Sequence, residues 1–266
     1  MVESIKELRK KCSSKSLIDD WFTEKISRNI SIYFTKLWLL LGMSANQVTT
    51  FIVIFGILSS ILLFTGNLYL MLIGILALIF NFILDASDGE VARYNKTKSL
   101  LGGHIDQIQH HLLPRLYFFG IGFSVFLNTE MLSVLIFGLL CVIFSVSIVM
   151  DTLCWELVRV GLEDIQRKKR WNINSTKIIK QIGETKYKLV LTSPFRCPYD
   201  KVFLLFFILI EIINLRLMLF KPFMLLYLVI AFYGICFFLM QFISFIMHYK
   251  SKSIESYYQT LYIKKK

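Results

Sequence analysis

The sequence predicts an all-α, polytopic membrane protein with six transmembrane helices preceded by an N-terminal amphipathic interfacial helix. Hydrophobic residues make up 56% of the 266 residues, and the mean hydropathy is +0.61. Soluble domains contain about 45–50% apolar residues. Charged residues gather in a few segments, and the apolar runs between them are long enough to cross a bilayer as helices. These runs do not alternate polar and apolar residues, as the strands of a membrane barrel would.

We expect one domain, residues 1–266, with its helices in the following order. Residues 19–43 carry an apolar residue every three or four positions with basic residues between them, which is typical of a helix lying among lipid headgroups. Ser44, Asn46 and Thr49 then supply turn and capping residues. The bundle, residues 44–248, is expected to hold six spans. The first covers about 48–65, and the second begins at about 68 and carries Asp85 and Asp88 near its inner end. The other four cover about 100–126, 131–157, 202–215 and 223–248.

The distribution of charge predicts the orientation of these spans. The net charge is +12, and nearly all basic residues fall in 1–45, 93–98, the polar loop 158–201 and the basic tail 249–266. Because basic residues stay on the cytoplasmic side, both termini and the acidic cluster described below are expected there, in an integral protein of a bacterial inner membrane. The same pattern argues against nucleic acid as a partner and favours membrane lipids, with loop 158–201 meeting anionic headgroups or closing over a substrate.

Two further features carry less weight. The five cysteines contain no CxxC pair, so neither a disulfide framework nor a zinc site is expected. Arg115 is a basic residue inside the third predicted span, and we expect it to pair with an acid such as Asp151 in the fourth, with contact to a substrate phosphate as the alternative. Glu211 is expected near an outer hairpin without a specific role.

The candidate functional residues lie at the inner ends of the second and third spans. On one continuous helix, residues with the spacing i, i+3, i+4, i+7 and i+8 share a face. That spacing is found in Asp85, Asp88, Gly89, Ala92 and Arg93. Acids near membrane depth are costly and are found where they pair or bind a ligand. Glycine permits close approach of a ligand or backbone, and arginine can bind phosphate.

A second set of residues is predicted to converge on the first. Gly102, Asp106 and His110 are spaced four apart, so they share a face of the next helix, and the connection between the two helices is short. Clustered carboxylates repel one another unless a cation lies among them, and hard divalent ions favour such ligands together with phosphates. Two ions about 3.5–4 Å apart could hold a pyrophosphate. The alternative is a purely structural polar network.

These residues also carry a resemblance to a known family. The pattern Asp85-x2-Asp88-Gly89-x2-Ala92-Arg93-x8-Gly102-x3-Asp106 resembles the signature of the CDP-alcohol phosphotransferase family of integral membrane enzymes. The segment Ser44-Ala-Asn46-Gln-Val-Thr49 is similar to the Pro-Asn-x-Val-Thr segment of that family, with Ala45 in place of the proline. The resemblance covers most of the chain and weakens across 158–201.

The resemblance implies a reaction, its cofactors and its partners. A CDP-linked donor would bind at the second and third spans, an acceptor hydroxyl would attack the distal phosphorus, and CMP would leave. The donor expected is CDP-diacylglycerol, as in phospholipid biosynthesis, with a CDP-linked polar alcohol and a lipid or glycan acceptor as the alternative. The implied cofactor is Mg²⁺ or Mn²⁺, as two ions, and the implied assembly is a homodimer. Asp85, Asp88, Asp106 and His110 are the expected metal ligands, and Asp85, Asp88, Gly89, Ala92, Arg93 and Gly102 are the expected cofactor-binding residues.

One position departs from the family pattern. The signature ends in a fourth aspartate, to which the role of general base is assigned, whereas this chain has His110. Histidine is suited to remove a proton at neutral pH, so His110 and Asp106 are the expected catalytic residues. Alternatively, His110 ligates the second metal and shifts the preference from Mg²⁺ towards Mn²⁺, or it marks a site that has lost activity. Two rival functions stay open, a divalent-cation or solute transporter and a silent nucleotide-binding scaffold.

Overall fold

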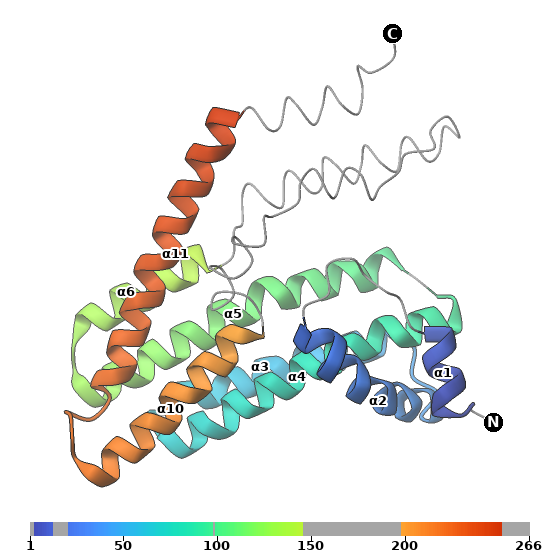
Figure 1. The fold of residues 1–266 in the computed structure, drawn as a ribbon, viewed down its shortest axis with the longest axis horizontal. Coiled ribbons are helices and arrows are strands. Elements are labelled where there is room, and N and C mark those ends of the chain that lie inside the picture. The colour runs from blue at the N-terminus through green and yellow to red at the C-terminus, as the bar shows by residue number, and fades with distance from the viewer. Residues whose placement is uncertain (1–2, 13–20, 98, 146–197, 252–266) are drawn as a thin grey trace.

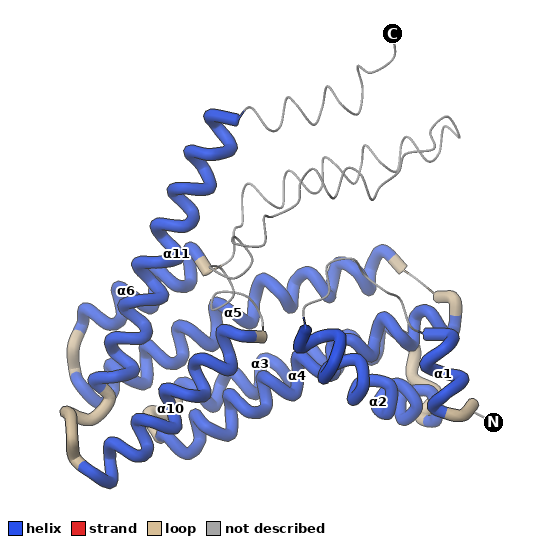
Figure 2. Tube along the Cα trace, viewed as in Figure 1, coloured by secondary structure: helices blue, strands red, loops and turns tan. Residues whose placement is uncertain are grey.

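The computed structural model describes residues 3–12, 21–97, 99–145 and 198–251, and this part of the chain contains helices and no strand (Figures 1 and 2). The predicted all-α fold is therefore confirmed for the described residues. In chain order the elements are α1 (Ile5–Cys12), a π-helical turn (Thr23–Ser27) leading into α2 (Arg28–Leu40), α3 (Ala45–Ile61) with a 3-10 turn (Leu62–Phe64), α4 (Leu68–Asn95), α5 (Leu100–Thr129), α6 (Leu132–Phe144), α10 (Tyr199–Leu217) and α11 (Met224–Ser251).

Four helical segments of the described chain are long and apolar enough to cross a membrane: Ala45–Phe64, Leu68–Asn95, Leu101–Thr129 and Met224–Ile243. They correspond to the first, second, third and sixth predicted spans. The predicted fourth span begins with the shorter α6, and the rest of it lies outside the described residues. Asp151, most of loop 158–201 and most of the tail 249–266 also lie outside them. The fifth coincides with α10, which carries four charged residues. The count of six spans stays a prediction.

The ends of the helices follow from local sequence. Ser44 and Gln47 form a reciprocal capping box at the start of α3, in which the Ser44 side chain accepts from the Gln47 N–H and the Gln47 side chain accepts from the Ser44 N–H. Gly66 has a φ of 70°, and the Asn67 side chain caps α4 by accepting from the Tyr69 N–H at 2.9 Å. The first of these turns was predicted from its capping residues, and the second has the left-handed φ that glycine readily adopts.

The apolar core lies between α4, α5, α6, α10 and α11, at the end of the bundle away from α1 and α2 (Figure 1). Its largest side chains are aromatic: the rings of Tyr117 and Phe118 have centroids 4.8 Å apart, and Phe118 lies 4.8 Å from Tyr233. The Tyr117 hydroxyl donates to the buried carboxylate of Asp200, which ties α5 to α10. This core leaves the opposite ends of α4 and α5 for polar residues.

α2 packs on α4 (Figure 1), and the contact is made through polar side chains. The Ser31 hydroxyl donates to Glu90 Oε1 at 2.9 Å, and the Thr35 hydroxyl donates to Glu90 Oε2 at 2.5 Å. Trp38 belongs to the predicted apolar stripe but is buried, and its indole N–H donates to the Ser87 hydroxyl at 3.0 Å. The large apolar residues on the other side of the helix are exposed, among them Tyr33, Leu37, Leu40 and Leu41.

Glu211 differs from the expectation that it has no specific role. It lies next to the α10–α11 connection, as predicted, but its side chain is fully buried. Its Oε1 atom accepts hydrogen bonds from the Asn214 amide at 2.9 Å and from the Phe223 N–H at 2.7 Å. Glu211 therefore joins the end of α10 to the residue that precedes α11, a contact that spacing along one helix does not reveal.

Candidate functional site

The turn between α4 and α5 brings the two predicted sets of residues together. α4 ends at Asn95, and Lys96 adopts the left-handed conformation with a φ of 54°. The Thr97 N–H then donates to the Ala92 carbonyl at 3.0 Å, which satisfies an end carbonyl of the helix. Ser99 caps α5 by accepting from the Gly102 N–H at 3.0 Å. The two helices therefore reverse direction within a few residues, and their polar ends lie side by side (Figure 1).

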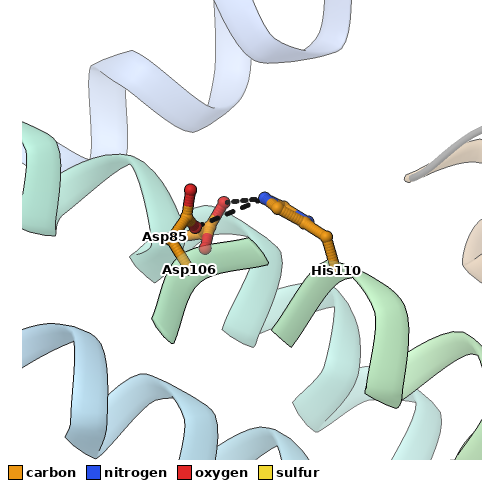
Figure 3. Close-up of side chains that lie close together, drawn as sticks. All are labelled: Asp85, Asp106 and His110. Atoms are coloured by element: carbon orange, nitrogen blue, oxygen red, sulfur yellow. Dashed lines mark ion pairs between the residues drawn. The ribbon is translucent and has the colours of Figure 1, made fainter. Parts of the chain in front are cut away.

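Three of the four predicted metal ligands converge on one point. Asp85, from α4, and Asp106 and His110, from α5, each offer a ligand atom, and these atoms all lie within 4.8 Å of one another. The His110 Nε2 atom is 3.6 Å from Asp85 Oδ2 and 3.4 Å from Asp106 Oδ1 (Figure 3). We refer to these three residues as the triad. Figure 3 shows the imidazole directed at the two carboxylates.

The triad has the chemistry of a divalent metal site. Two carboxylates and an imidazole form a donor set that suits Mg²⁺ or Mn²⁺, with the nitrogen better tolerated by Mn²⁺. Like charges held this close are unfavourable unless positive charge lies between them. The Asp85 and Asp106 side chains are 18% and 39% exposed, so water can reach an ion here. The residues therefore fit such an ion.

Asp88 lies apart from the triad. Its Oδ2 atom accepts from the Thr49 hydroxyl at 2.7 Å, and its Oδ1 atom accepts from the Gly89 N–H. Thr49 also donates to the Ala45 carbonyl in its own helix, at 3.0 Å. The fourth predicted ligand is thus held by the first turns of α3 and is not among the atoms that converge on His110.

A cavity of about 250 Å³ adjoins the triad and contains most of the other predicted residues. It is formed by the start of α3, the end of α4 and the start of α5. The lining residues are Ala45, Asn46, Thr49, Asp88, Gly89, Ala92, Arg93, Thr97, Ser99, Gly102, Gly103 and Asp106. Asp106 belongs to both the cavity and the triad, so it connects the two parts of the site.

Arg93 is fixed at the edge of the cavity by the N-terminal helix. Its Nε atom donates to the Cys12 carbonyl, at the end of α1, at 2.6 Å. A Cβ atom added to Gly89 would lie 3.1 Å from Arg93 Nη1, so the guanidinium group lies close over the glycine. Gly89 thereby leaves room for a positive group inside the cavity, as the position of an anion-binding arginine requires.

Gly102 is required for the packing of α5 against α3. A Cβ atom at this position would lie 2.7 Å from Asn46 Oδ1 and 3.1 Å from the Ser99 hydroxyl. Asn46 Oδ1 accepts from that hydroxyl at 2.8 Å, so the three residues form one tight contact. Gly103, in contrast, has nothing within 4 Å of an added Cβ atom, which leaves open space beside the first turn of α5.

Sequence reasoning missed the polar residues that hold the acids in place. Asn46 and Thr49 were recognised as part of a capping segment, but their contacts with Ser99 and Asp88 depend on how α3 meets α4 and α5. Gln109 was not singled out, although its Nε2 atom donates to Asp85 Oδ1 at 2.8 Å. Glu90, inside the acidic motif, turns to α2 instead of the cavity.

Comparison with known proteins adds one match. A family model described as CDP-alcohol phosphatidyltransferase matches residues 43–232, which include the whole triad and every residue that lines the cavity. No curated protein matches the chain.

Proposed function

The chain belongs to the CDP-alcohol phosphatidyltransferase family, a family of transferases, and we propose that it moves a phosphatidyl group from CDP-diacylglycerol to an alcohol, with release of CMP. Family membership supports the general reaction, which is transfer of a substituted phosphate from a CDP-alcohol to an acceptor. The observation that carries the proposal for this site is the triad beside a cavity lined by Arg93 and Asp88. A transporter requires neither the cavity nor the arginine.

Asp85 and Asp106 would hold the divalent cation that members of the family use, and His110 Nε2 would join them as a ligand only in the alternative in which the imidazole is not the base. When bound, such an ion supplies the positive charge that stabilises phosphate oxygens during transfer. We extend the proposal to a second ion near Asp88, because Asp106 borders both the triad and the cavity in which Asp88 lies. Mg²⁺ and Mn²⁺ are both compatible with this donor set.

The cavity is the proposed site of the cytidine diphosphate. Arg93 provides a fixed positive group on one side, and the N-terminal end of α5, with open space at Gly103, forms the other side. Helix N-termini and arginine side chains both favour phosphate oxygens. Gly89 leaves room for the Arg93 guanidinium group, and Ala92 leaves the α4 wall beside it without a bulky side chain, so the nucleotide can lie there. In this arrangement the distal phosphorus faces Asp106 and the triad.

We propose His110 as the base that accepts the proton of the acceptor hydroxyl, with Asp106 as its partner. The Asp106 carboxylate, 3.4 Å from Nε2, can hold an Nε2–H and leave Nδ1 to take the proton. The hydroxyl oxygen then forms the new bond to the distal phosphorus, and the bond to the CMP oxygen breaks. A metal-ligand role has a specific observation in its favour too, since Nε2 is one of the three convergent atoms. The two roles use different nitrogen atoms.

The lipid nature of the donor has support from the surface next to the cavity. Leu101 and Ile108 are 59% and 43% exposed. They lie seven residues apart, so they share a face of α5, and Leu101 precedes the cavity residue Gly102. An acyl chain can lie on such an exposed apolar face while its headgroup reaches the helix ends. A CDP-linked polar alcohol, the alternative donor, has no need of that face.

The donor is identified with the purified protein in lipid nanodiscs, supplied with Mg²⁺ or Mn²⁺ and a pool of alcohols. CDP-diacylglycerol, CDP-choline and CDP-glycerol are compared as donors by CMP release and by mass spectrometry of the lipid products. We expect a new phospholipid from CDP-diacylglycerol and no product from the other two. Product from CDP-choline or CDP-glycerol alone would show that the polar alcohol is the transferred part, and would contradict the proposed donor.

A further inference from the structure

Gln109 lies behind the triad, next to His110 in the chain but buried. Its side chain is 3% exposed, whereas His110 is about half exposed. Its Nε2 atom donates to Asp85 Oδ1 at 2.8 Å, a contact that crosses from α5 to α4. The other oxygen of the same carboxylate, Oδ2, is the one that lies 3.6 Å from His110 Nε2. Gln109 and His110 therefore lie at opposite oxygens of the Asp85 carboxylate.

The hydrogen bond fixes both groups. A carboxylate that binds an ion needs one oxygen directed at the ion, and rotation about its side-chain bonds would move that oxygen away. The Gln109 amide opposes this rotation by holding Oδ1, and it does so with a neutral donor that adds no charge to the site. The reverse orientation of the amide would set two acceptor oxygens against each other.

Burial of Gln109 also carries a cost that the hydrogen bond has to offset. Its Oε1 atom is buried and has no hydrogen-bond partner among the described residues. An unpartnered buried amide oxygen is unfavourable, so a glutamine is a poor choice for simple helix packing, which leucine or methionine would serve better. A donor aimed at Asp85 is a specific reason for an amide at this position.

We propose that Gln109 is a positioning residue for the metal ligand Asp85, and that it sets the affinity of the site for a divalent cation. The inference rests on the proposed function in one respect, the binding of a metal by the triad. Partners that hold metal ligands in place typically contribute about 10–100-fold to metal affinity. Within the described part of the chain, Gln109 forms its side-chain hydrogen bond with Asp85 and does not line the cavity.

Substitution of Gln109 by Met, Q109M, tests the proposal, because methionine keeps the length of the side chain and removes both polar atoms. Gln107 supplies the matched control: it is the same residue type, two positions earlier on α5, and exposed. The readout is Mn²⁺ binding to the purified full-length protein in detergent, followed by the electron paramagnetic resonance signal of free Mn²⁺. We expect the dissociation constant of Q109M to rise about 10–100-fold and that of Q107M to stay at the wild-type value.

Q109N provides a second variant, since it keeps the amide but is one methylene shorter and loses its reach to Asp85. Thermal unfolding without metal shows which variants are folded. A folded Q109M or Q109N that binds Mn²⁺ as tightly as the wild type would overturn the role of Gln109 and leave the proposed transferase intact. Wild-type protein that binds no Mn²⁺ would overturn the metal site itself and, with it, this inference. Weaker binding by Q109M with unchanged binding by Q107M supports the proposal.

Discussion

At the scale of single residues, Asp106 has the most connected position in the site. Its carboxylate lies 3.4 Å from His110 Nε2 and also borders the cavity that contains Asp88 and Arg93. One side chain thus faces both the proposed ion and the proposed nucleotide. An acid in this position can partner the base, bind the metal and border the distal phosphate. The i+4 spacing places Asp106 on the same face of α5 as His110, so that it can partner the imidazole.

Replacement of His110 by Ala separates its two possible roles. If His110 is the base, CMP release falls by about 10²–10⁴-fold, the range for removal of a general base, while Mn²⁺ affinity changes little. This is the outcome we expect. The control is Asn128→Ala, at the other end of α5, which we expect to leave both CMP release and Mn²⁺ affinity unchanged. A large loss of Mn²⁺ affinity in His110→Ala would identify the imidazole as a metal ligand instead.

At the scale of elements, α2 supports the part of α4 that carries the acids. Glu90 directs its carboxylate to Ser31 and Thr35, and Ser87 accepts from the Trp38 indole. These contacts occupy the face of α4 that is turned away from the cavity, while Asp88 and its neighbours occupy the opposite face. The exposed apolar side of α2 remains for lipid, which supports the predicted interfacial helix.

Substitution of Thr35 by Ala removes one of the two hydroxyl groups that hold Glu90. The Oε2 atom then loses its 2.5 Å contact inside a buried interface. We expect a loss of about 1–3 kcal/mol in the free energy of unfolding, because a buried carboxyl oxygen is left without its hydrogen-bond partner. Thermal unfolding in detergent measures it, with Thr50→Ala as the control, since the Thr50 side chain is exposed and bonds within its own helix. Equal midpoints for both variants would contradict the role of this contact.

The sequence was informative about these elements where the physics is local. Capping by Ser44 and Asn67, and the convergence of the residues spaced along α4 and α5, follow from helix geometry and short turns. The partners of Glu90 and Gln109 do not, because they depend on which faces of distant helices meet. The separation of Asp88 from the triad has the same origin: Thr49, on α3, takes its carboxylate.

At the scale of the whole molecule, the site lies at one end of the bundle with α1 and α2 (Figure 1). The connections at the opposite end follow Phe64, Thr129 and Leu217, and they carry few basic residues. The positive-inside rule therefore favours a cytoplasmic site with cytoplasmic termini. A single domain, six spans, a bacterial inner membrane and a homodimer complete the proposed organisation.

Labelling of single cysteines tests this orientation. In a chain whose native cysteines are replaced by serine, Leu219→Cys lies in the exposed α10–α11 connection and Asn95→Cys at the exposed end of α4. With an impermeant maleimide, we expect Leu219→Cys to react in intact bacterial cells and Asn95→Cys to react only after permeabilisation. The reverse pattern would place the site on the outer side of the membrane.

The most direct test of the whole account is metal-dependent CMP release by the purified protein, supplied with CDP-diacylglycerol, an alcohol pool and Mn²⁺ or Mg²⁺. Asp88→Asn is measured beside Glu130→Gln, which alters an acid at the far end of α5. We predict that the wild type and Glu130→Gln release CMP only with metal, and that Asp88→Asn is slower by about 10²–10³-fold, as for loss of one group that stabilises transition-state charge. Equal rates for Asp88→Asn and the wild type, or release that needs no metal, would contradict the account.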